Sequence, residues 1–177
     1  MFGFDFDLEF VELLNYGDVT VDLSGYVFSI NSLPGFTFPE GTVLAAGEFA
    51  LLVPSAVAAS NYQSTGVQIF ELTQGNFGNG GGSLSLADAF DNVVNAVTYN
   101  DAGDWPSSSL GILGFNYVES PDGGCATLEY IPEILELYID MPTGNGNDFG
   151  GNWQASWVDG GTPGTVSYTH LTLPTKA

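Results

Sequence analysis

The sequence predicts an all-β fold, a β-sandwich of about seven to nine strands with almost no helix. Short runs rich in Val, Leu, Tyr and Phe recur along the 177 residues, separated by clusters of Gly, Pro, Asn and Asp. Short apolar runs separated by turn-forming residues are typical of a β-sandwich or β-barrel. No segment keeps a 3.6-residue apolar period, which argues against a parallel α/β fold. The length fits one domain.

The alternation of large apolar residues within the runs predicts which side chains share one face of a strand. In the run 26–30 every second residue is large and apolar, and the run 49–53 alternates in the same way. The Gly-rich stretch 75–82 predicts a flexible loop, because a phosphate-binding loop needs a following helix and usually a Lys. Only the segment 132–137 resembles a helical turn. The expected strands are 10–14, 20–22, 26–30, 49–53, 67–72, 83–87, 93–99, 126–130 and 136–138.

The charge balance excludes several classes of partner. There are 21 Asp and Glu residues against one Lys and no Arg, a formal net charge of −20. The only basic side chains, His170 and Lys176, both follow residue 166. Such a surface repels nucleic acid and anionic membranes, but it accepts cations, neutral polymers and basic proteins. No membrane insertion is expected, because the most apolar stretch, 41–60, is interrupted by Gly and Pro.

The last twelve residues differ in character from the rest. Residues 166–177 resemble a translated sequencing adapter and contain both basic groups. We expect a domain over 1–165 and a non-native tail over 166–177, with a larger parent protein. The start carries acids where a signal peptide needs a basic region, so we expect the signal peptide upstream of this fragment.

Several segments with turn chemistry follow one another in a defined order. Residues 8–18 read Leu-Glu-Phe-Val-Glu-Leu-Leu-Asn-Tyr-Gly-Asp, and 21–26 read Val-Asp-Leu-Ser-Gly-Tyr. In these and the later motifs the chain resembles the lamin-tail domain family, in its bacterial extracellular type, over residues 8–165. The short apolar strand that usually precedes the first motif is reduced here to residues 2–6. The later motifs are Phe-Pro-Glu-Gly-Thr at 38–42, the pair of runs 83–86 and 91–99, Trp105-Pro106, Gly-Asn-Trp at 151–153 and Gly-Gly-Thr-Pro-Gly at 160–164.

The resemblance implies an immunoglobulin-like β-sandwich with a structural or interaction role. The residues 22–25 also predict a turn by themselves, without the resemblance. The side chains of Asp22 and Ser24 are expected to satisfy backbone amides, and Gly25 permits a positive φ. Tyr26 is then expected to enter the core.

The body of the chain lacks a catalytic set of side chains. With the tail set aside, no imidazole or amine remains for a triad or a Schiff base. A lone Cys125 cannot build a zinc site or a disulfide. Asp101 and Asp104 beside Trp105 are the best pair for a carboxylate-based glycoside hydrolase. The sequence therefore favours a non-enzyme, with the hydrolase as the weaker alternative.

Calcium is the one ion that the composition suggests, and no other cofactor is expected. Asp5, Asp7 and Glu9 alternate and fall on one face of an extended segment. They do not begin an EF-hand, because Phe10 and Tyr16 stand where that loop needs Gly and Glu. The three carboxylates are the calcium candidates.

Aromatic side chains supply the remaining candidate site. Trp157 lies outside the family-like motifs and is the first candidate for an exposed binding residue. We predict a non-catalytic binding or tethering module of a larger secreted or cell-surface protein, with a protein, glycan or surface polymer as partner. A carbohydrate-binding module that uses exposed aromatics is the alternative. The aromatic residues considered for such a platform are Trp105, Trp153, Trp157, Tyr16 and Tyr62.

Overall fold

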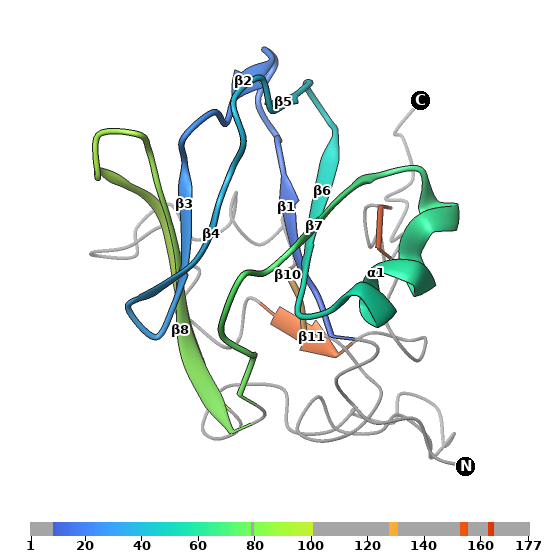
Figure 1. The fold of residues 1–177 in the computed structure, drawn as a ribbon, viewed down its shortest axis with the longest axis vertical. Coiled ribbons are helices and arrows are strands. Elements are labelled where there is room, and N and C mark those ends of the chain that lie inside the picture. Colours follow the sequence, from blue (N-terminus) through green and yellow to red (C-terminus); the bar gives the residue numbers. More distant parts are fainter. Residues whose placement is uncertain (1–8, 79, 101–127, 131–152, 156–162, 165–177) are drawn as a thin grey trace, which may run out of the picture.

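The computed structural model describes residues 9–78, 80–100, 128–130, 153–155 and 163–164 (Figure 1). Within these ranges, no helix has the length and hydrophobicity needed to cross a membrane. The elements are β1 (Val11–Leu14), β2 (Val21–Asp22), β3 (Val27–Ile30), β4 (Leu33–Thr37), β5 (Val43–Leu44), β6 (Phe49–Val53), α1 (Ala56–Tyr62), a 3-10 turn (Gln63–Thr65), β7 (Gln68–Glu71), β8 (Gly81–Ala87), β9 (Val93–Asn100), β10 (Leu128–Tyr130) and β11 (Trp153–Ala155).

Two sheets form the body of the fold (Figure 1). One has the strand order β4-β3-β8-β9 with antiparallel neighbours, and the other has the order β1-β6-β7. β6 and β7 run parallel, while β1 and β6 run antiparallel. The two-stranded ribbon β2-β5 lies at one end of the sandwich, and β10 pairs with β11. The prediction of an all-β sandwich is confirmed.

The main core lies between the two sheets. Phe28 and Ile30 of β3 meet Ala50 and Leu52 of β6, and each is at most 3% exposed. Tyr26 packs against this cluster, as the turn chemistry before it predicts. Burying large apolar side chains from both sheets is what holds such layers together.

β6 is buried on both of its faces. Ala50 and Leu52 face the main core, whereas Leu51 and Val53 belong to a second cluster with Tyr62. The helix α1 supplies Tyr62 to this cluster and connects β6 to its parallel neighbour β7. A parallel pair needs such a crossover connection. The sequence did not predict this helix, because seven residues are too few to show a helical period.

Three further strands were not predicted. β4 contains Pro34 and Gly35, which normally argue against a strand. Pro34 is tolerated because β4 is an edge strand of its sheet. β5 has only two residues, and β11 only three.

Two other sequence predictions meet the structure in part. The Gly-rich stretch is not wholly a loop, since Gly81 and Gly82 belong to β8. Of the expected strand 126–130, the described residues 128–130 form β10. The expected strand 136–138 and the helical turn 132–137 lie outside the described residues.

Candidate functional site

The turn between β2 and β3 is built by two side chains. The carboxylate of Asp22 accepts hydrogen bonds from the backbone amide of Ser24 (2.9 Å) and from its hydroxyl (2.5 Å). These bonds, the hydroxyl first, lower the pKa of Asp22. Ser24 Oγ in turn accepts from the amide of Gly41 at 2.8 Å, which joins this turn to the next one. Gly25 follows with φ 73°, a conformation that glycine adopts without strain.

Asn15 fixes the loop that follows β1. Its Nδ2 donates to the carbonyl oxygens of Val19 (2.8 Å) and Leu44 (2.9 Å), and its Oδ1 accepts from the amide of Gly17 (3.1 Å). The backbone carbonyl of Asn15 accepts from the amide of Gly47 at 2.8 Å. Asn15 is 8% exposed, so a buried carboxamide with its bonds satisfied holds three chain segments together.

The hairpin loop between β8 and β9 is fixed in the same manner. Asp88 Oδ1 accepts from the amides of Phe90 (2.8 Å) and Asn92 (2.9 Å), and the Asn92 side chain donates to the same carboxylate. The bonds from Asn92 are the main reason that the pKa of Asp88 is lowered. Asp91 has φ 65°, a conformation that Asp tolerates in turns.

These turns lie at one end of the sandwich (Figure 1). The β2-β5 ribbon and the β8–β9 hairpin loop share that end, and a Cβ on Gly25 would lie 3.3 Å from Cβ of Ala89. We call this surface the loop end; it comprises residues 15–20, 22–25, 39–42, 45–48 and 88–92. Loops at one end of an immunoglobulin-like sandwich are a common place for recognition.

Two aromatic side chains stand out from the loop end. Tyr16 and Phe90 are each 85% exposed, and Val19 is 64% exposed. Tyr16 directly follows the buried Asn15, and Phe90 lies within the loop held by Asp88. The exposed aromatics are therefore mounted on backbone that side-chain hydrogen bonds hold in place, so little conformational entropy is lost when a partner covers them.

The charged side chains of the loop end are all acidic. Asp18, Glu40 and Asp91 are exposed, as is Asp22, whereas Asp88 is half-buried. No Lys, Arg or His occurs anywhere in residues 1–166. The loop end thus carries exposed apolar and aromatic side chains among acidic ones, in a negative field.

The structure separates the aromatic residues that the sequence suggested as a platform. Tyr62 is 6% exposed and packs edge-on against Phe10 at a ring distance of 5.1 Å, so its assignment to a binding platform was wrong. Tyr16 is exposed as a platform residue requires. Trp153 pairs through β11 with Tyr130 of β10, while Trp105 and Trp157 lie outside the described residues.

Phe90 was not predicted, although a Phe between Asp88 and Asp91 in a short hairpin loop is a signal that the sequence contained. The hydrolase candidates Asp101 and Asp104 lie outside the described residues and stay predictions.

Of the three calcium candidates, only Glu9 lies within the described residues; Asp5 and Asp7 do not. Glu9 is half-buried beside β1, and its carboxylate acts on Tyr99 of β9. Burial raises the pKa of Tyr99, the hydrogen bond from the Gly78 amide lowers it, and the charge of Glu9 adds to the rise. Over the described part of the chain, no three His, Cys, Asp or Glu side chains gather as a metal site.

The fold is that of an immunoglobulin-like all-β domain. The loops at its loop end are held in place by side-chain hydrogen bonds. The chain belongs to the lamin tail domain family: the family described as Lamin Tail Domain matches residues 3–101. This match includes the strands β1 to β9 and every turn of the loop end. The motifs from 105 to 164 lie beyond the match and stay predictions. A search of curated proteins finds no match to the chain.

Proposed function

We propose that this domain is a non-catalytic binding module that tethers a larger secreted or cell-surface protein to its partner through the loop end. The observation that carries the proposal is the pair Tyr16 and Phe90, each 85% exposed on a fixed turn. A Phe that stays largely in water gives up roughly 1.5 kcal/mol or more of burial energy. A partner that covers it recovers that energy, and aromatic residues are frequent energetic centres of interfaces.

Charge favours a basic partner protein over an acidic one. The loop end carries Asp18, Glu40 and Asp91 on its surface, and the chain has a net charge of −20. Arg and Lys side chains can stack on the exposed rings and pair with the neighbouring carboxylates. Association is then steered by long-range attraction and weakens as salt is added.

The tethering role places this domain beside other domains of the same parent chain. Secretion or surface display is part of the proposal, and the acidic composition of residues 1–166 supports it by keeping an extracellular domain soluble. The proposal expects no cofactor for binding, with calcium at Asp5, Asp7 and Glu9 as the one candidate ion.

The test uses glycan and protein arrays probed with the full chain and five variants. Tyr16→Ser and Phe90→Ser, separately and together, remove the exposed rings. Val57→Ser is the matched control, because Val57 is 54% exposed on α1, away from the loop end. Trp157→Ala tests the aromatic that the sequence singled out.

The proposal expects array proteins with basic surfaces to bind, the double variant to lose at least ten-fold in affinity, and the Val57 control to keep it. Loss of glycan binding in Trp157→Ala alone would support a carbohydrate-binding module instead. Turnover of a polysaccharide that Asp101→Asn or Asp104→Asn abolishes would overturn the non-catalytic assignment.

A further inference from the structure

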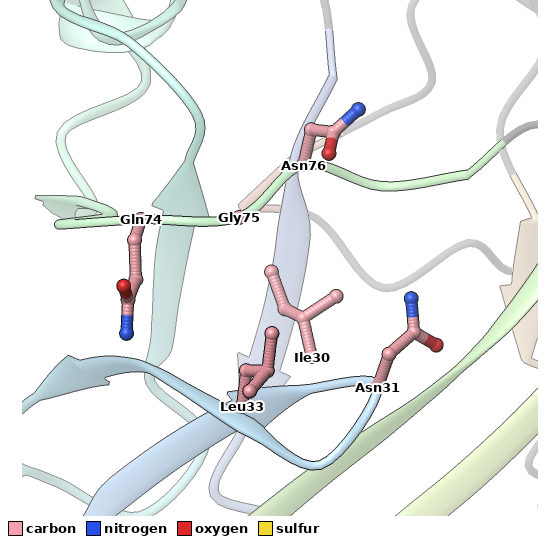
Figure 2. Close-up of a pocket in the computed structure, with 6 residues that line it drawn as sticks. All are labelled: Ile30, Asn31, Leu33, Gln74, Gly75 and Asn76. Atoms are coloured by element: carbon pink, nitrogen blue, oxygen red, sulfur yellow. The ribbon is translucent and has the colours of Figure 1, made fainter.

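A small hollow opens at the end of β3 that is remote from the loop end (Figure 2). The turn between β3 and β4 forms one wall, and the segment that follows β7 crosses opposite to it as the other wall. Its volume is about 140 Å³. A hollow of this size suits one ring or one side chain. The lining residues are Ile30, Asn31, Leu33, Gln74, Gly75 and Asn76.

The hairpin wall presents a donor whose identity the structure fixes. Asn31 and Ser32 have φ 51° and 64°, as in the tight two-residue turns of β-hairpins. The backbone amide of Ser83 donates to Asn31 Oδ1 at 3.0 Å, and the Asn31 amide donates to the Ser83 carbonyl at 2.7 Å. Because an amide N–H can only donate, the oxygen of the Asn31 carboxamide must face β8. Its Nδ2 group is the atom left to donate to a ligand.

The opposite wall presents an acceptor by the same reasoning. Thr73 holds this segment onto β4, since both its amide (2.9 Å) and its hydroxyl (2.7 Å) donate to the Gly35 carbonyl. Gln74 Nε2 donates to the carbonyl of Pro34. A carbonyl can only accept, so the nitrogen of the Gln74 carboxamide is the atom that faces Pro34, and Oε1 is left to accept.

The floor between these two amides is aliphatic and closely packed. Figure 2 shows Ile30 and Leu33 between the side chains of Asn31 and Gln74. Leu33 is 66% exposed, so its side chain is open to a ligand. Gly75 has φ 90°, and a Cβ there would lie 3.1 Å from Ile30 Cδ1. The absence of a side chain at position 75 lets the wall approach the floor.

None of the six lining residues is charged, although the chain carries a net charge of −20. A charged ligand would find no counter-charge in the lining, whereas a neutral one with hydroxyl groups finds a donor, an acceptor and an apolar floor. We propose that this hollow binds one neutral sugar residue of a glycan, with Leu33 under the ring and Asn31 and Gln74 at its edges. The site is separate from the loop end and does not depend on the function proposed there.

The experiment follows the backbone amide and methyl signals of the isotope-labelled chain by NMR during sugar titrations. The probes are the methyl glycosides of glucose, galactose, mannose and N-acetylglucosamine, with glucuronic acid as the charged comparison and N-methylacetamide as a peptide mimic. At least one neutral glycoside is expected to shift Leu33, Gly75 and the Asn31 side-chain amide together in the millimolar range.

Leu33→Ala removes the side chain under the ring, and Asn76→Ala removes a polar side chain of the lining. Each is expected to weaken that binding by roughly five-fold or more, the factor that one lost hydrogen bond or contact gives. Both residues are exposed, so the folded spectrum should persist. Gln63→Ala, an exposed position in the 3-10 turn, is the matched control and should leave the binding unchanged. The Tyr16→Ser, Phe90→Ser double variant should also bind the sugar normally, which separates this test from that of the loop end.

The proposal is overturned if no neutral glycoside shifts these signals at 100 mM, or if the shifts map elsewhere. Tighter binding of N-methylacetamide than of every glycoside would assign the hollow to a peptide group instead. Equal binding of glucuronic acid would also contradict it, because the acidic chain should disfavour an anion.

Discussion

The side chain of Glu12 in β1 accepts a hydrogen bond of 2.5 Å from the backbone amide of Gly164, across 152 positions of sequence. Gly164 has φ 78°, and a Cβ there would lie 2.7 Å from Cγ1 of Val67. Gly164 is thus held between β1 and the residue before β7 by a charge-assisted hydrogen bond and a close approach.

Breaking this contact from either side should destabilise the domain. Glu12→Ala is expected to lower the free energy of unfolding by about 1–2 kcal/mol, since a partly buried bond to a charged group is lost. Gly164→Ala should cost more than Gly47→Ala: both have positive φ, but a Cβ at Gly47 meets nothing within 4 Å. Urea unfolding of the three variants and of the Glu12→Ala, Gly164→Ala double variant measures this. Simple additivity of the two losses would contradict a direct contact.

The same contact makes the expected boundary of the domain testable. A chain that ends at Thr165 keeps Gly164 and should melt within a few degrees of the full chain, because residues 166–177 are expected to add little to the core. A chain that ends at Thr162 loses the bond to Glu12 and should melt roughly 2–8 °C lower. Calorimetry of both truncations gives the answer. A large loss in the longer truncation would show that the tail is an integral strand.

Asn15→Asp should destabilise the domain, although the two side chains are nearly the same size. Asn15→Asp replaces the Nδ2 donor by an oxygen facing the carbonyls of Val19 and Leu44, at a site 8% exposed. We expect a loss of about 3 kcal/mol at neutral pH. The loss should shrink below pH 5, where the introduced carboxyl is protonated and regains a donor. Asn76→Asp, at an exposed position, is the control that should stay near wild type in thermal unfolding at both pH values.

Tyr62 should make the domain sensitive to high pH. Burial raises the pKa of Tyr62 from 10.0 to about 12. The unfolded chain therefore releases this proton first, so the stabilisation is complete below pH 10 and is lost between pH 10 and 12. The change is about 2 kcal/mol by pH 12. Tyr62→Phe should flatten this part of the stability profile. A profile that keeps its slope in Tyr62→Phe would assign the loss to other groups.

Calcium binding at Asp5, Asp7 and Glu9 would stabilise the folded chain by mass action. The melting temperature should then rise with calcium concentration, and the rise should disappear in Asp5→Asn, Asp7→Asn. Magnesium at equal concentration controls for general screening of the negative charge. Identical melting curves in chelator and in millimolar calcium would remove these residues as ligands.

Much of the fold followed from local patterns in the sequence. Alternation and turn residues predicted β1, β3, β6, β7, β8 and β9, because a strand that buries one face must alternate and a turn with positive φ favours Gly. The roles of Asp22, Ser24 and Gly25 were predicted for the same reason, since their bonds span only a few residues. The lack of basic side chains before residue 166 is likewise visible in the sequence alone, and the prediction about classes of partner rests on it.

The tertiary structure alone decided which surfaces are covered. Leu51 and Val53 became core residues because α1 packs over them, and Tyr62 became buried for the same reason, whereas Tyr16 remained exposed. β4 pairs with its hairpin neighbour β3, and Thr73 and Gln74 also bond to its carbonyls from 38 and 40 positions away. These contacts join segments that are remote in sequence, and a local sequence pattern does not indicate which remote segment will pack against it. The hollow beside Leu33 and the bond between Glu12 and Gly164 arise in the same way, since each depends on where a distant backbone group lies.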